Sequence, residues 1–410
     1  MKSRNYQKYL LEPCHQSARI KIFLNKVDMI GSINAVSKSV VYYFILINVI
    51  FFLTSFIPPV SKTLPVTVTL KSAASFPIGT ATDATPIQNN SLYSGVLFTE
   101  FNSVTCESAM EFDRVEWAPG SFNFSMADSV VTFAQQHNQR VHGHTLIWHD
   151  ALPNWVVNFT GDSAAWENIF KNHIIGMVSH YKGKVASWDV VNEAIRDDDG
   201  TLINQDYAGP GSGSLWRQHL GSDYIARAFQ YAHAADPNAI LFYNDYGNDN
   251  GGWNDTKLNA LLALVANLKS RNIPIGGIGI QMHINIRTDN SNIAATLRKM
   301  AATGLKIHIS ELDISVNPTN NPGYFPYNPN IIYTDSLQNI QADKFQFIAE
   351  IYQITVPPAQ RFGITVWEFS DAYCDAAFDK LKDWPLLFDN NYQKKATYYG
   401  FLKGLQRSDM

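Results

Sequence analysis

The sequence predicts a (β/α)8 barrel, an α/β fold, over residues 71–410. Short apolar runs rich in β-branched residues alternate, from Ala74 onward, with amphipathic stretches of helical character. Eight such strands within about 330 residues fit this barrel. An open, doubly wound sheet is the alternative. It would carry a glycine-rich phosphate-binding turn after its first strand, and Gly79-Thr80-Ala81 does not have that pattern.

Most of the predicted strands have an end marked by Gly, Asn or Asp, which are residues typical of turns. In chain order the strands are Phe76–Ala81, Phe101–Thr105, Arg140–Trp148, Val185–Glu193, Ile240–Tyr246, Ile275–His283, Lys306–Asp313 and Phe362–Ser370.

The predicted helices have apolar residues at helical spacing and recognisable ends. They are Met126–Gln136, Ala164–His180, Tyr224–Ala235, Thr256–Arg271, Ile293–Thr303 and a last helix around Ala396–Leu405. Asp162 and Ser163 are candidate caps for the second of these helices. Asp236-Pro237 stops the third, and Pro274 and Gly304 follow the next two.

Residues 1–70 differ from the rest of the chain and are predicted to be a leader. Val40–Ile57 is an apolar run with basic residues upstream and Pro58 and Pro59 behind it. The run fits either a signal peptide with a long leader or a single membrane anchor, and the lack of a clean small-x-small cleavage site favours the anchor. A translation start at Met29 would instead give a short, signal-like leader. In either case we expect the protein to be secreted or held at the cell surface.

The composition of the chain excludes some functions. The formal net charge is −4, so the chain has no excess of basic residues that would indicate nucleic acid as a partner. Cys14, Cys106 and Cys374 are too few and too scattered for a disulfide framework or a zinc site. Cys106 and Cys374 could pair if the fold brought them together, but we expect inert thiols. We also expect a monomer that needs neither a cofactor nor a metal.

Four of the predicted strands end in a cluster of polar or aromatic side chains. These clusters are His144 with Trp148, Asn192 with Glu193, Gln281 with His283, and Glu311 with Asp313. In (β/α)8 barrels the catalytic side chains lie at the carboxyl ends of the strands. The clusters are therefore candidate site residues, although strand ends also meet loops, and loops are polar in general.

Glu193 and Glu311 end the fourth and the seventh predicted strand, so they would face each other across the mouth of the barrel. Two opposed carboxylates can hydrolyse a glycosidic bond, one as a proton donor and the other as a nucleophile or as a base that activates water. A nucleophilic mechanism requires the two groups to stand about 5–5.5 Å apart. The alternative is that both glutamates bind Lys or Arg at the rim.

Five motifs together resemble glycoside hydrolase family 10, whose members are retaining endo-β-1,4-xylanases built on a (β/α)8 barrel. The motifs are SWDVVNEA at 187–194, ISELDI at 309–314, HGHTLIWH at 142–149, ITVWEFSD at 364–371 and PLLFD at 385–389. The likeness runs from about Phe76 to the C-terminus in the order of the family. It implies xylan or a related β-1,4-linked polysaccharide as the substrate.

The resemblance implies a role for several residues. Glu193 is the acid and base, Glu311 is the nucleophile, and Asn192 holds the sugar 2-hydroxyl. His283 contacts the nucleophile and has Asp313 as its partner. The other residues implied to bind sugar are Glu107, His144, Trp148, Gln281 and Trp367, with Trp367 as a stacking floor. Without the motifs, Trp148 would be interpreted as core filler and His144 as a barrel histidine with its hydrogen bonds satisfied.

The sequence departs from the family pattern in two places. After Glu107 the family has an asparagine and, three positions further on, a lysine, which together grip the sugar one unit beyond the cleavage point. Here Ser108 and Glu111 hold these positions, and the second change reverses the charge. The family also brings another Trp from the loop after Ser370. This loop offers Tyr373 and Phe378 instead, with Trp384 further along.

Three other functions are alternatives to the xylanase. A mixed-linkage glucanase would keep both glutamates and change the sugar. A non-catalytic carbohydrate-binding barrel is favoured weakly by Ser108 and Glu111, but such a protein should lose Glu193 or Glu311 first. A metal-dependent hydrolase would use His142, His144 and His149, but on a strand His149 points away from the other two.

Overall fold

A computed structural model describes residues 68–204, 213–247, 255–317, 327–374 and 381–407. The predicted leader with its apolar segment at 40–57 lies outside these residues, and so do Cys14 and Phe378. Among the helices that the structure describes, none has both the length and the apolar character that crossing a membrane requires.

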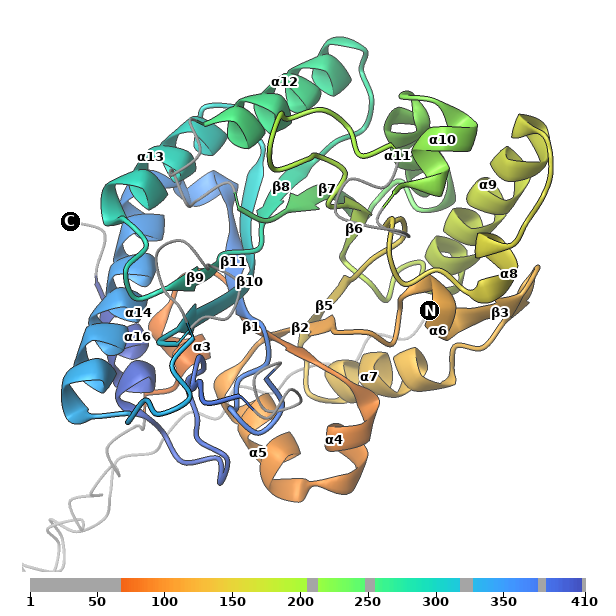
Figure 1. Cartoon of the computed structure of the whole chain (residues 1–410). Helices are drawn as coiled ribbons and strands as arrows, with labels where there is room; N and C mark the ends of the chain where they lie inside the picture. Colours follow the sequence, from red (N-terminus) through yellow and green to blue (C-terminus); the bar gives the residue numbers. More distant parts are fainter. Residues whose placement is uncertain (1–67, 205–212, 248–254, 318–326, 375–380, 408–410) are drawn as a thin grey trace, which may run out of the picture. The chain divides into compact units, whose positions relative to one another are not determined.

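The centre of the domain is a closed parallel barrel, which confirms the predicted fold class (Figure 1). Its eight strands, in the order in which they neighbour one another, are β11 (Arg361–Val366), β1 (Ile78–Thr82), β2 (Ser103–Cys106), β5 (Arg140–Gly143), β6 (Ser187–Asn192), β7 (Ile240–Asp245), β8 (Gly277–Ile280) and β10 (Lys306–Ser315). All of these neighbours pair in parallel, and the pairing of β10 with β11 closes the ring.

Within the described residues, three short strands lie outside the ring. β9 (His283–Asn285) pairs in parallel with the carboxyl end of β10, and this pairing sets Asp313 opposite His283. β3 (Glu116–Ala118) and β4 (Ser121–Phe122) form a separate antiparallel ribbon.

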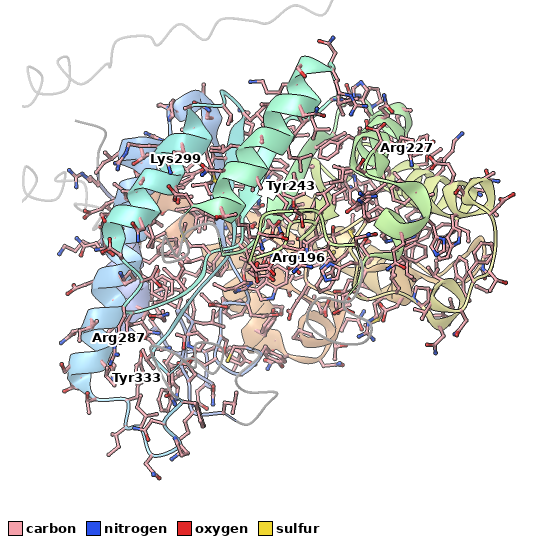
Figure 2. All side chains as sticks on the ribbon, turned by 45° about the horizontal axis from the view of Figure 1, so that its top comes forward. Arg196, Arg227, Tyr243, Arg287, Lys299 and Tyr333 are labelled. Atoms are coloured by element: carbon pink, nitrogen blue, oxygen red, sulfur yellow. The ribbon has the colours of Figure 1, made fainter. Side chains whose placement is uncertain are left out.

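At least one helix follows each barrel strand, so every return to the next strand crosses the outside of the barrel (Figure 1). The helices are α3 (Leu70–Ala73), α4 (Ala84–Asn89), α5 (Ser91–Glu100), α6 (Phe112–Val115), α7 (Ser125–Gln136), α8 (Asn154–Val157), α9 (Ser163–His180), α10 (Leu215–Leu220), α11 (Tyr224–Ala235), α12 (Thr256–Ser270), α13 (Asn290–Ala301), α14 (Asp335–Thr355), the 3-10 turn η1 (Pro358–Gln360) and α16 (Ala396–Leu405). Arg227 on α11 and Lys299 on α13 belong to this outer layer, whereas Tyr243 on β7 is buried (Figure 2).

The six predicted helices are all present within three residues of their predicted bounds, and the Asp162 side chain caps α9 by accepting a hydrogen bond from Ala165 N at 2.9 Å. The sequence does not predict α5 or the 21-residue α14. The buried face of α14 includes Gln341, Lys344 and Gln353 among its apolar residues. These polar side chains interrupt the apolar periodicity that a helix prediction depends on.

Three predicted strands extend too far along the chain. β5 ends at Gly143, β8 ends at Ile280 with a break before β9, and β11 ends at Val366. Most of the residues that follow remain buried, and this burial explains why their sequence resembles a continuing strand. Their pairing is interrupted and irregular: Leu146 N, for example, still donates to Asp189 O of β6 at 3.0 Å, and Ile147 forms only an isolated bridge with Val191. Met282 and Glu368 adopt left-handed backbone angles, with φ of 64° and 60°.

Four aromatic and imidazole rings fill one level inside the barrel. They belong to His142 on β5, Phe242 on β7, His308 on β10 and Phe362 on β11, and every pair of ring centroids is separated by 4.5–5.9 Å. A filled interior of this kind makes the barrel a packed core and gives the strand ends above it a rigid base.

Cys106 and Cys374 are both buried, and neither forms a disulfide. The pairing between them that the sequence left open is therefore absent from this structure, in which each thiol packs separately.

Candidate active site

Glu193 and Glu311 both lie at the carboxyl end of the barrel, each carried by a strand that is largely buried. Glu193 follows the last residue of β6, and its backbone is left-handed with a φ of 54°. Such a conformation costs a non-glycine residue about 1–3 kcal/mol, and strain of this kind is concentrated at functional sites. Glu311 lies within β10, beside an irregularity in the pairing of β10 with β11. Only 4% of Glu311 is exposed, whereas Glu193 is half-buried.

Two donors hold the carboxyl group of Glu193. The amide nitrogen of Gln281 donates to Oε1 at 2.7 Å, and the indole nitrogen of Trp148 donates to Oε2 at 2.9 Å. Burial raises the pKa of Glu193 to about 7. The Gln281 bond opposes this shift, the charges on Asp245 and Glu311 add to it, and the Trp148 bond opposes it. Glu193 is thus poised to exchange a proton near neutral pH.

The carboxyl group of Glu311 also has two partners. The amide nitrogen of Asn244 donates to Oε1 at 2.6 Å, and Nε2 of His283 lies 3.1 Å from Oε2. The other ring nitrogen of His283 lies 2.7 Å from Oδ2 of Asp313. Burial works against a charge on His283, but Asp313 and Glu311 on its two sides outweigh burial and raise its pKa well above the ordinary value. The ring is one-third exposed, so water screens part of this charge.

One chain of hydrogen bonds joins the two glutamates. The amide oxygen of Asn192 accepts from Gln281, which holds Glu193, at 3.3 Å, and from Asn244, which holds Glu311, at 2.9 Å. The amide oxygen of Asn244 accepts in turn from Ser310 Oγ at 2.7 Å. The residue types in this chain are amides and a hydroxyl, which can orient both carboxyl groups without supplying a competing acid.

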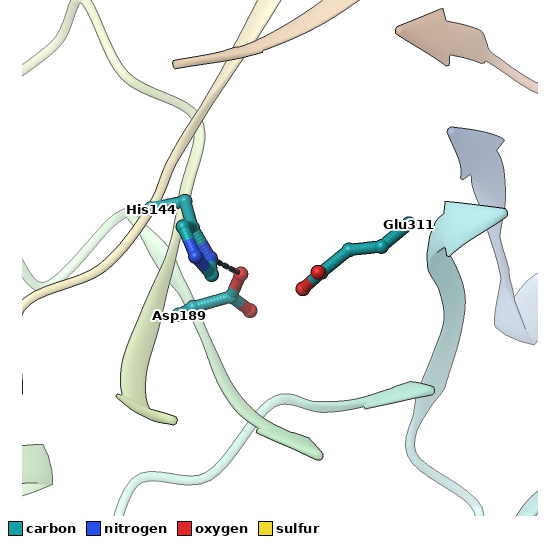
Figure 3. A group of neighbouring side chains, drawn as sticks. All are labelled: His144, Asp189 and Glu311. Atoms are coloured by element: carbon teal, nitrogen blue, oxygen red, sulfur yellow. Dashed lines mark hydrogen bonds and ion pairs between the residues drawn. The ribbon is translucent and has the colours of Figure 1, made fainter. Parts of the chain in front are cut away.

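His144 and Asp189 form a second polar pair next to Glu311. Nδ1 of His144 lies 2.9 Å from Oδ2 of Asp189, and the ligand-type atoms of His144, Asp189 and Glu311 all lie within 4.8 Å of one another (Figure 3). Burial opposes a charge on His144. The bond to Asp189 and the charges on Glu311, Asp189 and Glu111 prevail and raise the pKa of His144 to about 9. His142 contacts the same Asp189 oxygen at 3.0 Å.

His149 takes no part in this cluster. β5 ends before His144, so the strand alternation that the sequence suggested for His149 does not extend to it. The side chains of the described chain whose donor atoms come close enough together for a shared cation are His144, Asp189 and Glu311.

Trp367 lies beside both histidines of the site. Its ring is 5.3 Å from the His144 ring and 6.3 Å from the His283 ring, edge to face in both cases. Trp367 is half-buried, as is Trp148 on the Glu193 side. Both therefore offer part of an aromatic face to solvent.

Glu107 is half-buried and comes directly after β2, where its backbone N–H donates to Thr82 O at 3.1 Å. The neighbouring Ser108 donates its hydroxyl proton to Asp83 Oδ2 at 2.7 Å, so this side chain anchors the loop. Glu111 is largely buried, with 15% of its side chain exposed. Burial raises the pKa of Glu111 to about 7, while the nearby His144 charge lowers it.

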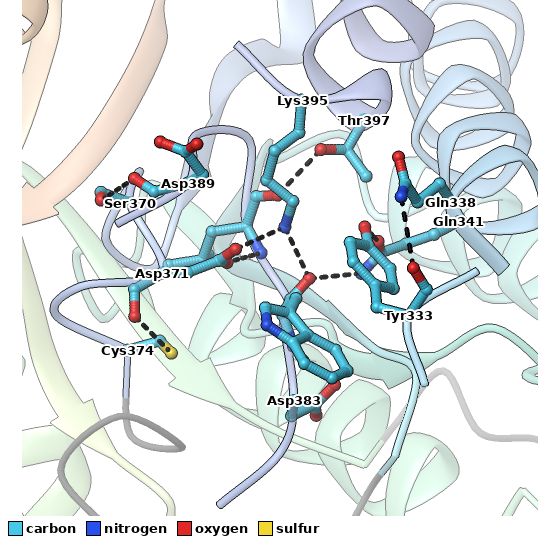
Figure 4. Close-up of polar contacts among 12 residues, drawn as sticks. Tyr333, Gln338, Gln341, Ser370, Asp371, Cys374, Asp383, Asp389, Lys395 and Thr397 are labelled. Atoms are coloured by element: carbon cyan, nitrogen blue, oxygen red, sulfur yellow. Dashed lines mark hydrogen bonds and ion pairs between the residues drawn. The ribbon is translucent and has the colours of Figure 1, made fainter. Parts of the chain in front are cut away.

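Trp384 packs away from these residues, on Tyr333, with the two rings stacked at 4.8 Å. The carbonyl oxygen of Trp384 accepts a bond from Lys395, and Lys395 also pairs with Asp371 at 2.7 Å (Figure 4). Tyr373 packs edge to face on Tyr93, with the ring centroids at 5.2 Å.

Sequence reasoning placed Glu193, Glu311, Asn192, Gln281, His283, Asp313, His144, Trp148 and Trp367 in one site, and the structure brings all of them together through the contacts above. It missed Asp189, although β6 already supplied candidates, and it gave no role to Asn244 on β7, although Asn244 follows the family pattern. The signal for Asp189 is a carboxylate inside the apolar strand SWDVV, because a buried charge requires partners.

Comparison with known proteins connects this site to one family. The model of "Glycosyl hydrolase family 10" matches residues 68–404. Among curated proteins, "Endo-beta-1,4-xylanase Xyn10C" of Cellvibrio japonicus is 37% identical over 347 residues, which are 80% of this chain and 56% of the relative. "Exoglucanase XynX" of Acetivibrio thermocellus is 35% identical and is matched over 28% of its length. The chain thus spans little more than half of the first of these relatives and about a quarter of the second.

Solved structures show the same likeness. A variant of xylanase 10C from Cellvibrio japonicus in complex with xylopentaose has a TM-score of 0.76 and 35% identity, with 83% of this chain and 69% of that chain covered. Xylanase 10B from Thermotoga petrophila in complex with xylobiose has a TM-score of 0.73 and 33% identity, with 82% and 97% covered.

Proposed function

Because this chain belongs to glycosyl hydrolase family 10, we propose that it is a retaining endo-β-1,4-xylanase that hydrolyses internal xylosidic bonds of xylan. The observation that carries the proposal is the contrast between two carboxyl groups of one hydrogen-bonded site. Glu193 is held by neutral donors at a raised pKa, whereas Glu311 is held by an amide and by a histidine. Two carboxyl groups in such different surroundings fit an acid and a nucleophile.

The first step we propose is attack by Glu311 on the anomeric carbon of the bound sugar. As the new ester bond forms, the glycosidic bond breaks and Glu193 gives its proton to the leaving oxygen. His283, held by Asp313, and Asn244 both contact the Glu311 carboxyl group and would keep it oriented until attack.

The second step reverses the roles. Glu193, now ionised, takes a proton from a water molecule, and the water oxygen bonds to the anomeric carbon while the bond to Glu311 breaks. The product keeps the anomeric configuration of the substrate, and both glutamates return to their first state.

Other residues of the site fit the binding of sugar. The amide oxygen of Asn192 is occupied by two donors, so its NH2 group is the one that would reach a sugar hydroxyl. Trp367 would lie under the sugar ring as a stacking surface. Glu107 would accept a hydroxyl of the sugar one unit beyond the cleavage point, and His144 and Gln281 would line the space between.

The test is the release of reducing sugar from xylan, with cellulose and mixed-linkage β-glucan in parallel. A relative named an exoglucanase makes a glucan the second candidate substrate. We expect xylan to be preferred. Glu311→Ala should lower kcat by about 10⁴-fold or more. The matched control is Glu350→Ala on α14, which removes a surface ion pair with Arg407 and should leave kcat unchanged.

Turnover of xylan that survives Glu311→Ala would exclude this nucleophile, and binding of xylan without any turnover by the natural protein would indicate the non-catalytic barrel. Product NMR tests the stereochemistry, because an α-anomer formed first would contradict retention. We also propose that the protein is exported, and N-terminal sequencing of the cellular and secreted material tests this. A cytosolic protein with an intact Met1 would contradict it.

A further inference from the structure

Glu368 is a buried carboxyl group that the mechanism above does not use. It lies two residues after β11, only 2% of it is exposed, and its φ is 60°. A left-handed conformation is unfavourable for a residue with a side chain and persists where the surroundings fix it. A buried acid in a strained conformation at the carboxyl end of the barrel therefore calls for a physical reason.

Tyr93 on α5 holds Glu368 from one side. The Tyr93 hydroxyl lies 2.9 and 2.8 Å from the two carboxyl oxygens, and Thr82 Oγ1 on β1 lies 2.7 Å from the same hydroxyl. A hydroxyl has a single proton. When Tyr93 donates to Glu368, Thr82 must donate to Tyr93, so the three groups form a directed chain that ends on the carboxyl group.

Glu107 acts on Glu368 from the other side. In addition to burial, the charge on Glu107 and a side-chain hydrogen bond between the two carboxyl groups raise the pKa of Glu368. Two ionised carboxylates have only acceptor atoms, so this bond requires a proton on one of them. The two glutamates follow β2 and β11, which lie on either side of β1 in the barrel. Glu368 is enclosed, whereas Glu107 is half-buried at the mouth of the barrel.

The groups around the pair favour keeping this proton. Burial raises the pKa of Glu368 well above its ordinary value, the charges on Glu107 and Asp83 add to the shift, and the Tyr93 bond opposes part of it. Tyr392 faces the pair from the loop before α16, and its own pKa is raised by burial, by Tyr373 and by Glu368. The neighbours that act on Glu368 are thus acids and phenols.

We propose that Glu368 is a positioning residue that shares one proton with Glu107 and thereby fixes Glu107 toward the sugar one unit beyond the cleavage point. With the proton shared, the carboxyl group of Glu107 is held by Glu368 and keeps further lone pairs that can accept from a sugar hydroxyl. Loss of the proton leaves two negative carboxylates next to each other. Their repulsion turns Glu107 away and weakens the binding of that sugar. The inference rests on the proposed function.

The test compares an aryl β-xylobioside, which reaches the outer sugar position, with an aryl β-xyloside, which does not. The ratio of the two kcat/KM values isolates the outer sugar, because the titration of Glu193 affects both substrates alike. We expect the ratio of the natural protein to fall on the alkaline side of the active pH range. Glu368→Gln should keep the ratio constant there, since its amide donates to Glu107 permanently and its oxygen accepts from Tyr93.

The matched variant is Glu368→Gly, which removes the carboxyl group and suits the left-handed backbone. It should lower the ratio about tenfold at every pH. Tm should change little, because relief of the left-handed strain offsets the hydrogen bond that Tyr93 loses. A Glu368→Gln ratio that falls with pH as in the natural protein, or a Glu368→Gly ratio equal to that of the natural protein, would overturn the proposal. If the natural protein cleaves neither glycoside, the proposed function fails instead.

Discussion

The hydrogen bond from Trp148 to Glu193 allows a single residue to change the pKa of the proposed acid. Trp148 donates to the ionised form of Glu193 and so lowers its pKa. Burial works in the opposite direction and is the larger effect. The protonated fraction of Glu193 is therefore set by a few side chains from different strands.

We expect kcat/KM on a xylo-oligomer to fall as pH rises through about 7, because Glu193 must carry a proton to act as the acid. Trp148→Phe removes a donor to the carboxylate, so the pKa of Glu193 should rise and the alkaline limb of the pH profile should move to higher pH. Trp117→Phe is the control, since Trp117 is 65% exposed and donates to Arg114 O. A limb that moves to lower pH would contradict this assignment of the acid.

Substitution of Glu111 tests whether binding of the outer sugar has been weakened or is provided by other residues. Glu111 replaces the lysine of the family pattern and lies close enough to His144 for each to shift the pKa of the other. Glu111→Lys should tighten the binding of short xylo-oligomers, measured by calorimetry, if the lysine contact is what is missing. It should also lower the pKa of His144, because a cation takes the place of an anion. Unchanged or weaker binding would show that Glu107 and its neighbours have rebuilt the site.

At the scale of elements, α14 fixes the seam where the barrel closes. The hydroxyl of Tyr352 on α14 donates to Ile307 O on β10 at 2.7 Å and accepts from Gly363 N on β11 at 3.1 Å. One buried hydroxyl thus serves backbone groups of both strands at the closing pair. Glu311 lies on the same strand β10, so the stability of this seam also supports the site.

Tyr352→Phe should lower the free energy of unfolding by about 1–3 kcal/mol, because two buried backbone groups lose their partner while the ring still fills its space. Urea unfolding measures this loss. Tyr399→Phe is the matched change on α16, where the ring is 58% exposed, and it should alter stability little. Equal stability of both variants would show that water replaces the Tyr352 hydroxyl at the seam.

At the scale of the whole molecule, residues 68–410 form one compact unit, and the family model matches 68–404 within it. We expect a chain that begins at Val68 to unfold in one thermal transition and to have the same kcat/KM on xylan as the full chain, because every barrel strand lies within it. Calorimetry and reducing-sugar release measure both quantities. Aggregation or lost activity of the shorter chain would show that residues 1–67 contribute to the fold.

The sequence by itself determined the barrel and the positions of the two acids. Strands and helices follow from the local spacing of apolar residues, and parallel strands bring their carboxyl ends to one face. Glu193 and Glu311 could therefore be assigned to the same end of the barrel from their own motifs. Strand ends were predicted less well, as in His144–Trp148, because a buried loop and a buried strand have similar composition.

Only the tertiary structure decided which side chains meet and how protons are distributed among them. Tyr93 and Glu368 are 275 positions apart, and Asn244 and Glu311 are 67 apart, so no local pattern connects them. A raised pKa arises from burial and from neighbouring charges, and both depend on the packing of distant segments. The contacts of Asp189, Asn244 and Glu368 became visible for this reason only once these distant segments had been placed in the fold.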